Sequence, residues 1–186
     1  IDCMVRPPTR EPNYLYRYLE DGAAGFLVPL VSDPQTAYNL VQATKYPPLG
    51  NRGMDGAGFD GDYGISVWKP GSTYNADANR ETFIITQVET LQAVTAAEEI
   101  ASIEGIDGLF IGPGDLGLRI ANTPGGTDLT MDKAIEKVAA AAKKYDEIKI
   151  NLSACKRFSL AFRSLFGPVP NTKHQFCIVL DIARFT

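Results

Sequence analysis

The sequence predicts an α/β fold built on a parallel sheet, because short apolar runs alternate with stretches of helical period along the chain. Two of these runs, residues 82–89 and 108–115, each end in a carboxylate and lie about one βα unit apart. Apolar residues make up 45% of the 186-residue chain and charged residues 22%, which is ordinary usage for a globular domain with a buried core. We therefore expect neighbouring parallel strands joined by helices.

The first part of the chain predicts two βα units. Residues 2–5 form a short strand, which ends at the following proline pair because proline cannot donate to a sheet hydrogen bond. The segment 14–19 places large apolar side chains on one helical face. Residues 25–29 are apolar throughout, as expected of a strand covered on both faces. A Ser-Asp-Pro-Gln capping pattern at 32–35 then predicts a helix whose buried stripe lies within residues 37–44.

The long segment 45–80 has no clear periodicity and is punctuated by glycines. A loop of this length inside a compact domain is usually functional or disordered, so we expect a lid or an interface element. Its single tryptophan, Trp68, is expected to pack rather than to contact a ligand.

The next part of the chain continues the βα pattern. Residues 82–89 and 108–115 predict strands, and a helix over 95–103 is expected between them because its small apolar residues share one stripe. Residues 116–128 predict a loop. A helix is expected over 131–145, with lysines at its C-terminal end.

The last residues differ from the rest, so we divide the chain into a domain over 1–150 and a divergent C-terminal tail over 151–186. The tail holds five basic residues and one acidic residue, and it lacks clear helix caps. It is either a divergent or mis-spliced gene end, or a diverged helix followed by a strand at 176–180.

Composition excludes several classes of function. A net charge of −4 leaves no basic footprint for nucleic acid. No apolar run approaches the about 20 residues of a membrane span, so no membrane association is expected. The cysteines Cys3, Cys155 and Cys177 are too scattered for a disulfide framework or a zinc knuckle, which fits a reducing cytoplasm.

The two carboxylates that end neighbouring strands, Glu89 and Asp115, are the main candidates for chemistry. Parallel strands bring both to the C-terminal end of the sheet, and hard divalent cations prefer carboxylate oxygen. The alternative is that each carboxylate caps the helix that follows it. Gln87 shares a strand face with Glu89, so it either orients a substrate or a metal-bound water, or bonds to a neighbouring strand.

Four motifs carry a resemblance to a known family. Gln-Val-Glu-Thr at 87–90, Gly-Pro-Gly-Asp-Leu at 112–116, Tyr-Pro-Pro-Leu-Gly-Asn-Arg-Gly at 46–53 and Val-Arg-Pro-Pro at 5–8 follow one another in the family's order and spacing. They resemble the metal-dependent pyruvate aldolases of aromatic-acid degradation, typified by 4-hydroxy-2-oxoheptanedioate aldolase, within the citrate-lyase-like superfamily. The resemblance covers residues 3–145. It implies a partial (β/α)8 TIM barrel of the phosphoenolpyruvate/pyruvate-binding type.

The resemblance also implies a chemistry and its residues. Glu89 and Asp115 would hold Mg²⁺ or Mn²⁺, with Co²⁺ or Zn²⁺ as possible occupants, and a 2-oxo acid such as pyruvate would chelate the ion. Arg6 matches the arginine on the keto oxygen and would be catalytic. Gln87, Gly114 and Asp115 would contact the substrate, the last two through backbone N–H groups of a glycine-rich turn. The reaction would cleave a 4-hydroxy-2-oxo acid to pyruvate and an aldehyde.

The chain also departs from the family pattern. A barrel of this type typically needs about 250 residues, and roughly the first two βα units, with the family's Asp and His proton-transfer pair, are absent. The sole histidine, His174, matches nothing in that motif, and Gly117 replaces a serine. Arg52 is expected to be structural or at a subunit contact. Because an incomplete barrel leaves strand edges unpaired, we expect a homo-oligomer.

Two other functions remain open. One is a citrate-lyase-like acyl-CoA lyase that keeps the metal pair, although the chain has no recognisable basic cluster for coenzyme A. The other is a catalytically impaired, truncated barrel that acts as a metal-binding or oligomerisation module.

Overall fold

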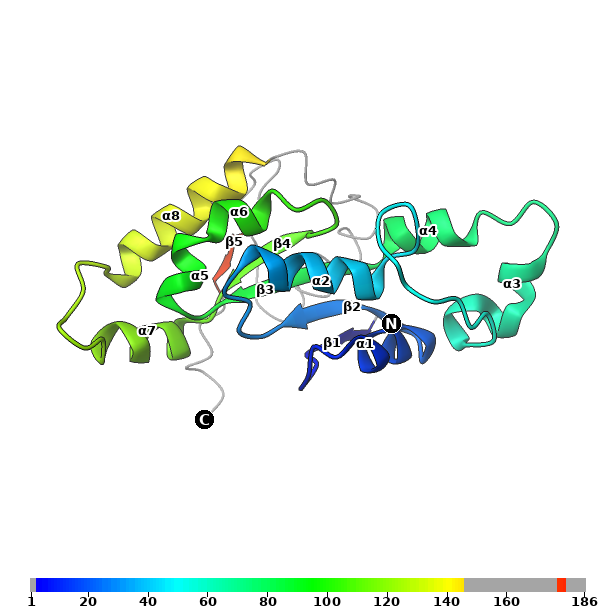
Figure 1. The fold of residues 1–186 in the computed structure, drawn as a ribbon, viewed down its shortest axis with the longest axis horizontal. Coiled ribbons are helices and arrows are strands. Elements are labelled where there is room, and N and C mark those ends of the chain that lie inside the picture. Colours follow the sequence, from blue (N-terminus) through cyan, green and yellow to red (C-terminus); the bar gives the residue numbers. More distant parts are fainter. Residues whose placement is uncertain (1–2, 146–176, 180–186) are drawn as a thin grey trace, which may run out of the picture.

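The computed structural model describes residues 3–145 and 177–179, and these form a five-stranded parallel sheet in the order β1-β2-β3-β4-β5. The strands are β1 (Cys3–Val5), β2 (Ala23–Val28), β3 (Phe83–Val88), β4 (Gly108–Ile111) and β5 (Cys177–Val179) (Figure 1). Each strand pairs with the next one along the chain, as repeated βα units require. The predicted α/β class is therefore confirmed. Most of the tail, including His174, lies outside the described residues.

Strand register brings the ends of β3 and β4 level with each other. Val88, the last residue of β3, pairs with Ile111, the last residue of β4. The residues that follow, Glu89 and Gly112, therefore begin at the same C-terminal end of the sheet. This confirms that neighbouring parallel strands deliver the two predicted segments to one end. The strand predicted over 108–115 ends at Ile111, however, so Asp115 does not close it and lies in the helix that follows.

Helices cover one face of this sheet. Helices α1 (Pro12–Glu20), α2 (Pro34–Thr44), α6 (Ala97–Ala101) and α8 (Met131–Lys144) contact one another in that order, which follows the order of the strands. The shared core is made of aliphatic side chains, fully buried examples being Leu15, Val28, Ile84, Ile100, Ile111 and Val138. The predicted helices at 14–19, 37–44 and 131–145 are confirmed within a few residues.

The connection between β3 and β4 differs from the single helix predicted over 95–103. Two short helices, α5 (Leu91–Thr95) and α6, meet at Ala96, whose ψ of 4° is not helical. Of the predicted stripe, Ala97 and Ile100 are fully buried, as expected, whereas Ala96 is only partly buried. The helical region begins earlier than predicted because Thr90 caps α5 by accepting a hydrogen bond from the Ala93 N–H at 3.0 Å.

A helix also replaces much of the loop predicted over 116–128. Helix α7 (Pro113–Ala121) begins directly after β4, with proline at its first turn. The prediction was wrong because Gly114 and Gly117 lower the helical signal, whereas burial of Leu116 against the core holds the helix in place.

The segment 45–80 is likewise more ordered than a loop. It contains the 3₁₀ helix η1 (Phe59–Gly64), α3 (Ile65–Trp68) and the start of α4 (Tyr74–Glu81). The buried Arg52 organises it through an ion pair to Asp60 Oδ2 at 2.6 Å, and the Tyr74 hydroxyl donates to the same oxygen. Arg52 is therefore structural, as one of the two predicted alternatives stated.

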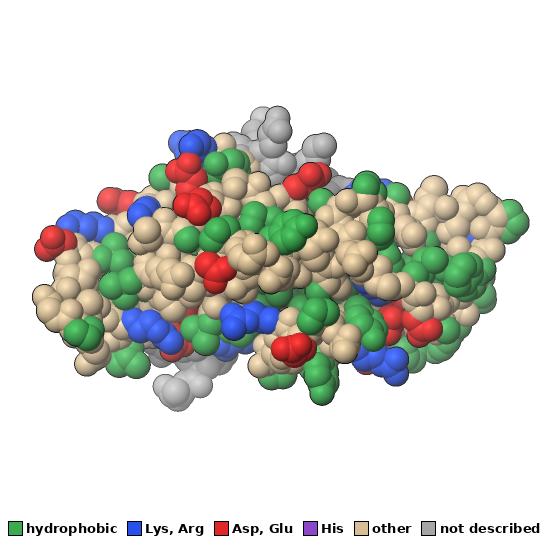
Figure 2. Space-filling model, in the orientation of Figure 1, with side chains coloured by type: hydrophobic (Ala, Val, Ile, Leu, Met, Phe, Trp, Pro, Cys, Tyr) green, Lys and Arg blue, Asp and Glu red, His purple; other side chains and the backbone are tan. Residues whose placement is uncertain are grey.

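Trp68, which was expected to pack, is 66% exposed. The side chains of Phe59, Tyr63 and Ile65, from the same segment, are also exposed. Figure 2 shows hydrophobic side chains gathered at this end of the molecule. Among the described residues, no helix is long and apolar enough to cross a membrane.

The N-terminal end of the sheet, opposite the ends of the strands that precede Glu89 and Gly112, holds an ion pair between the buried Lys45 and the partly buried Asp107. The Lys45 ammonium is 4.0 Å from Asp107 Oδ2, and it donates to the backbone oxygens of Asn79 and Thr82. Burial lowers the pKa of Lys45 and raises the pKa of Asp107, while each charge partly offsets the shift of the other. Asp107 also accepts a hydrogen bond from the Ile84 N–H at 2.7 Å, so it joins the starts of β3 and β4.

Removing one partner of this pair should destabilise the fold. We expect Asp107→Leu to lower the free energy of unfolding by about 3 kcal/mol, because it leaves the buried Lys45 ammonium without its counter-charge, and Lys45→Met to lower it less, because the Asp107 side chain is 23% exposed. The double variant should lose clearly less free energy of unfolding than the sum of the losses in the two single variants. Urea titrations followed by circular dichroism measure all three losses, and additive losses would contradict the coupling.

The cap of α2 makes a pH-dependent prediction. The cap is Asp33, one residue later than the Ser32 pattern implies, and it accepts from the Thr36 N–H at 2.7 Å. This bond lowers the pKa of Asp33 below its ordinary 3.8. Because the folded pKa is the lower one, the stabilisation is full above the ordinary pKa and is lost as the pH falls through the folded pKa.

Asp33→Ala should therefore lower the free energy of unfolding by about 1 kcal/mol at neutral pH, and by progressively less in acid. Asp33→Asn supplies an uncharged cap, so its advantage over Asp33→Ala should not change with pH. Urea midpoints between pH 7 and pH 3 test this, and a constant gap between wild type and Asp33→Ala would refute it.

Candidate active site

Glu89 is the centre of the candidate site and lies directly after β3, where it is only 2% exposed. Its Oε2 accepts the Leu30 N–H at 2.9 Å, and its Oε1 accepts the Gln87 side-chain amide at 3.2 Å. The Arg6 guanidinium lies 3.8 Å from Oε1. A buried carboxylate is stable only when it is paired and hydrogen-bonded, and these contacts from the ends of β1, β2 and β3 meet that requirement.

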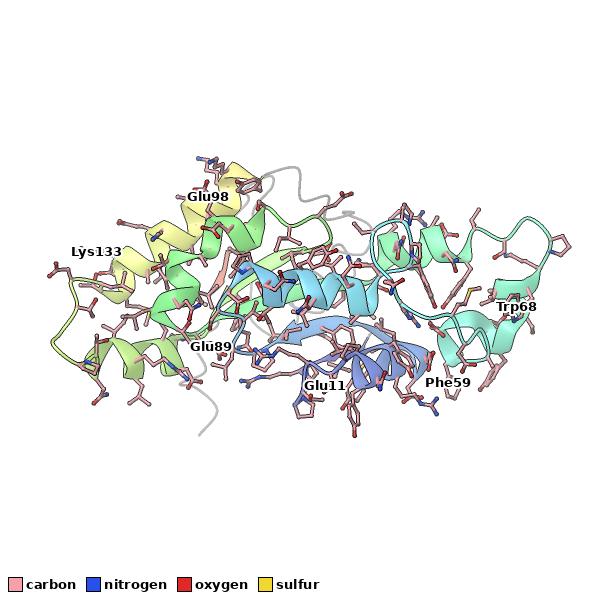
Figure 3. All side chains as sticks on the ribbon, in the orientation of Figure 1. Glu11, Phe59, Trp68, Glu89, Glu98 and Lys133 are labelled. Atoms are coloured by element: carbon pink, nitrogen blue, oxygen red, sulfur yellow. The ribbon has the colours of Figure 1, made fainter. Side chains whose placement is uncertain are left out.

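Gly112, which follows β4, lies against the Glu89 side chain. A Cβ placed on Gly112 would lie 2.7 Å from Glu89 Oε1 and 2.6 Å from Glu89 Cγ. Gly112 also donates its backbone N–H to the Val88 carbonyl at 3.1 Å. Only glycine therefore allows the start of α7 to lie this close to Glu89. Figure 3 shows Glu89 below the helices that follow β3, far from Phe59 and Trp68.

Gln87 lies beside Glu89, as the predicted strand alternation requires. Its carboxamide is 2% exposed and donates to Glu89 rather than to a neighbouring strand. Its Oε1 atom is buried without a hydrogen-bond partner. Because buried polar atoms are nearly always satisfied, this acceptor has capacity for a donor or a cation at the site.

Asp115 lies in the first turn of α7 and is half-exposed. Its Oδ1 forms an ion pair with Arg119 Nη1 at 3.0 Å. The N-cap of α7 is Gly112 and that of α5 is Thr90, so neither Asp115 nor Glu89 occupies the capping position that the alternative interpretation assigned to them.

The predicted backbone donors sit at the N-terminus of a helix rather than in a free turn. A Cβ on Gly114 would meet no atom within 4 Å, so the space beside it is open. The free N–H groups of a helix start favour anions, which keeps Gly114 and Asp115 as predicted contacts for a substrate carboxylate.

Arg119 was missed in the sequence. Its Nη1 donates to the Glu89 carbonyl oxygen at 3.3 Å and to the carbonyl and carboxylate oxygens of Asp115. The signal was present as an acid and a base four residues apart, but it is informative only on a helix, and this segment was predicted as a loop.

The donor atoms of the site fit a hard divalent cation. Two carboxylates and the unsatisfied Gln87 oxygen are oxygen ligands, which Mg²⁺ and Mn²⁺ prefer. Among the described residues no three His, Cys, Asp or Glu side chains converge, so water or substrate oxygens would complete the coordination.

Comparison with known proteins identifies relatives. A family model described as "HpcH/HpaI aldolase/citrate lyase" matches residues 1–154. The chain is 38% identical to a hydroxypyruvate/pyruvate aldolase of Deinococcus radiodurans, over 72% of this chain and 47% of the relative. It is 34% identical to a 5-keto-4-deoxy-D-glucarate aldolase of Klebsiella pneumoniae, over 76% of this chain and 54% of the relative. The chain thus spans about half the length of these relatives.

A solved HpcH/HpaI aldolase from Desulfitobacterium hafniense shares the fold, with a TM-score of 0.65 and 22% identity over 93% of this chain and 75% of that one. Together with the parallel sheet, this likeness confirms the predicted fold, an α/β chain forming part of a TIM-type barrel.

The contact between Gly112 and Glu89 predicts unequal effects for two neighbouring glycines. Gly112→Ala should lower the free energy of unfolding by about 1–3 kcal/mol, because its methyl group must displace the buried Glu89. Gly114→Ala should be neutral or stabilising by up to about 1 kcal/mol, because its methyl group enters open space in a helix. Urea denaturation of both metal-free variants tests this, and equal losses would argue against the close approach.

Proposed function

Because the chain belongs to the HpcH/HpaI aldolase/citrate lyase family, we propose that it carries the site of a metal-dependent aldolase that cleaves 4-hydroxy-2-oxo acids to pyruvate and an aldehyde. The observation that carries this proposal is the buried Glu89, which joins Arg6 and Gln87 beside the helix that bears Asp115. The relatives' names, a hydroxypyruvate/pyruvate aldolase and a 5-keto-4-deoxy-D-glucarate aldolase, support a 2-oxo acid as substrate.

Glu89 and Asp115 would hold the cation, Mg²⁺ or Mn²⁺ by the chemistry of the donors, with Co²⁺ or Zn²⁺ also compatible. A divalent cation bound there supplies Lewis-acid polarisation of the substrate keto group. When the bond between C3 and C4 breaks, the 4-hydroxyl gives its proton to solvent water and becomes the aldehyde oxygen. The electron pair passes to C3 and the keto oxygen, giving the enolate of pyruvate, which then takes a proton at C3.

The residues of the chain have separate roles in this proposal. Arg6 is permanently charged, so it would stabilise the negative charge that develops on the keto oxygen. The Gln87 carboxamide would orient the substrate or a bound water through its unsatisfied oxygen. The N–H groups of Gly114 and Asp115 would receive the substrate carboxylate.

We further propose that the protein works as a cytoplasmic homo-oligomer. The support is physical: the exposed Phe59, Tyr63, Ile65 and Trp68 form an apolar surface that water solvates poorly. Small 2-oxo acids and aldehydes are the proposed partners.

The purified chain should decarboxylate oxaloacetate weakly in the presence of Mg²⁺ or Mn²⁺, because that reaction also forms the pyruvate enolate but needs less proton transfer. Arg6→Ala and Asp115→Ala should each lower this rate by about a hundredfold or more, since each removes charge stabilisation. His174→Ala should leave the rate unchanged. Pyruvate release in a coupled assay, with and without EDTA, measures these effects.

One outcome would contradict the proposal, and a second would add a residue to the proposed site. Activity that survives EDTA would exclude a metal-dependent reaction. Loss of activity in a folded His174→Ala variant would mean that the proton-transfer group lies in the tail. Mn²⁺ binding without any pyruvate release would instead favour the second candidate, a metal-binding module.

A further inference from the structure

Arg119 touches both candidate metal ligands with one atom. Its Nη1 lies 3.3 Å from the backbone oxygen of Glu89, 3.2 Å from the backbone oxygen of Asp115 and 3.0 Å from Asp115 Oδ1. The first contact crosses from α7 to the end of β3, and the third fixes a carboxylate oxygen. Arg119 therefore links the strand that carries one carboxylate to the helix that carries the other.

Helix α7 is held to the core by the buried Leu116 and the partly buried Ile120, and neither of these contacts fixes the Asp115 carboxylate. Leu116 is its only buried side chain, and Leu118 is 64% exposed. Gly114 and Gly117 lie inside the helix, where each lowers helix stability relative to alanine. The orientation of the Asp115 carboxylate is therefore not fixed by core packing or by intrinsic helix propensity.

We propose that Arg119 is a positioning residue that fastens Asp115 to the end of β3, so that Asp115 and Glu89 face one divalent cation. The inference rests on the proposed function for the cation, but the fastening itself concerns the metal-free chain. The ion pair uses Oδ1 of Asp115, which would leave the second carboxylate oxygen, Oδ2, for the cation.

The opposite effect, competition between Arg119 and the cation for Asp115, is the weaker one. Both partners of the ion pair are partly exposed, so water screens the repulsion between the guanidinium and the cation. Solvent does not weaken in the same way the effect of Arg119 on the direction of the Asp115 carboxylate. Groups that hydrogen-bond to a ligating carboxylate typically change metal affinity by about 10–100-fold when they are removed.

The test is Mn²⁺ binding to the full chain, followed through the electron paramagnetic resonance signal of the free ion. Arg119→Met keeps the length of the side chain and should weaken binding by about tenfold. Arg119→Lys should lose less Mn²⁺ affinity than Arg119→Met, because the ammonium keeps the charge and can donate to the same oxygens. The matched control is Arg80→Met, which breaks a half-exposed helical ion pair to Asp77 at 2.7 Å, on α4. It should bind Mn²⁺ as the wild type does.

Hydrogen exchange of the metal-free variants separates this inference from the proposed function. Amides of α7 should exchange faster in Arg119→Met than in the wild type or in Arg80→Met, while the melting temperature is unchanged. If the wild type binds no Mn²⁺, the proposed function fails, and faster exchange in α7 still supports the fastening. Tighter or unchanged Mn²⁺ binding in Arg119→Met, or unchanged exchange in α7, overturns the inference.

Discussion

The parallel pairing of β3 with β4 is the constraint on which the site depends. Because Val88 and Ile111 are register partners, the chain leaves both strands at the same height. Glu89 and Gly112 are then neighbours, at a separation that a side chain on Gly112 would not permit. A shift of β3 by one residue would turn the carboxylate of Glu89 toward the opposite face of the sheet. The backbone hydrogen bonds between β3 and β4 thus determine where Glu89 and Gly112 lie relative to each other.

Burial of Glu89 then ties the ends of the other strands together. A carboxylate that is 2% exposed would be strongly destabilising without partners, and its partners come from different strands: Arg6 after β1, Leu30 after β2 and Gln87 in β3. Any displacement of one strand end leaves part of this charge uncompensated. The same contacts that stabilise the buried charge therefore hold Arg6 and Gln87 in the positions that the proposed reaction uses.

The sequence predicts the parts of this fold that repeat and misses those that depend on tertiary contacts. Strands β2, β3 and β4 can be recognised in the sequence because most of their residues are apolar, and the acids Glu89 and Asp115, which follow β3 and β4, mark the functional end. Helix α7 is invisible because Gly114 and Gly117 weaken its signal, while its stability comes from Leu116 and from Arg119. The order in residues 45–80 depends on the Arg52–Asp60 ion pair, a contact that no local pattern encodes. The division of the chain at residue 150 stays a prediction.

The charged groups at the two ends of the sheet differ in how fully they are partnered within the protein. At the N-terminal end, Lys45 and Asp107 are opposite charges whose remaining hydrogen bonds go to backbone groups, so the cluster is complete within the protein. At the C-terminal end, two carboxylates lie on neighbouring segments, the Gln87 oxygen lacks a partner, and Asp115 is half-exposed. A closed cluster stabilises the fold and offers nothing to a ligand. Glu89 and Asp115 are each paired with an arginine, but the unpartnered Gln87 oxygen and the half-exposed Asp115 leave oxygen atoms at this end that a cation can contact.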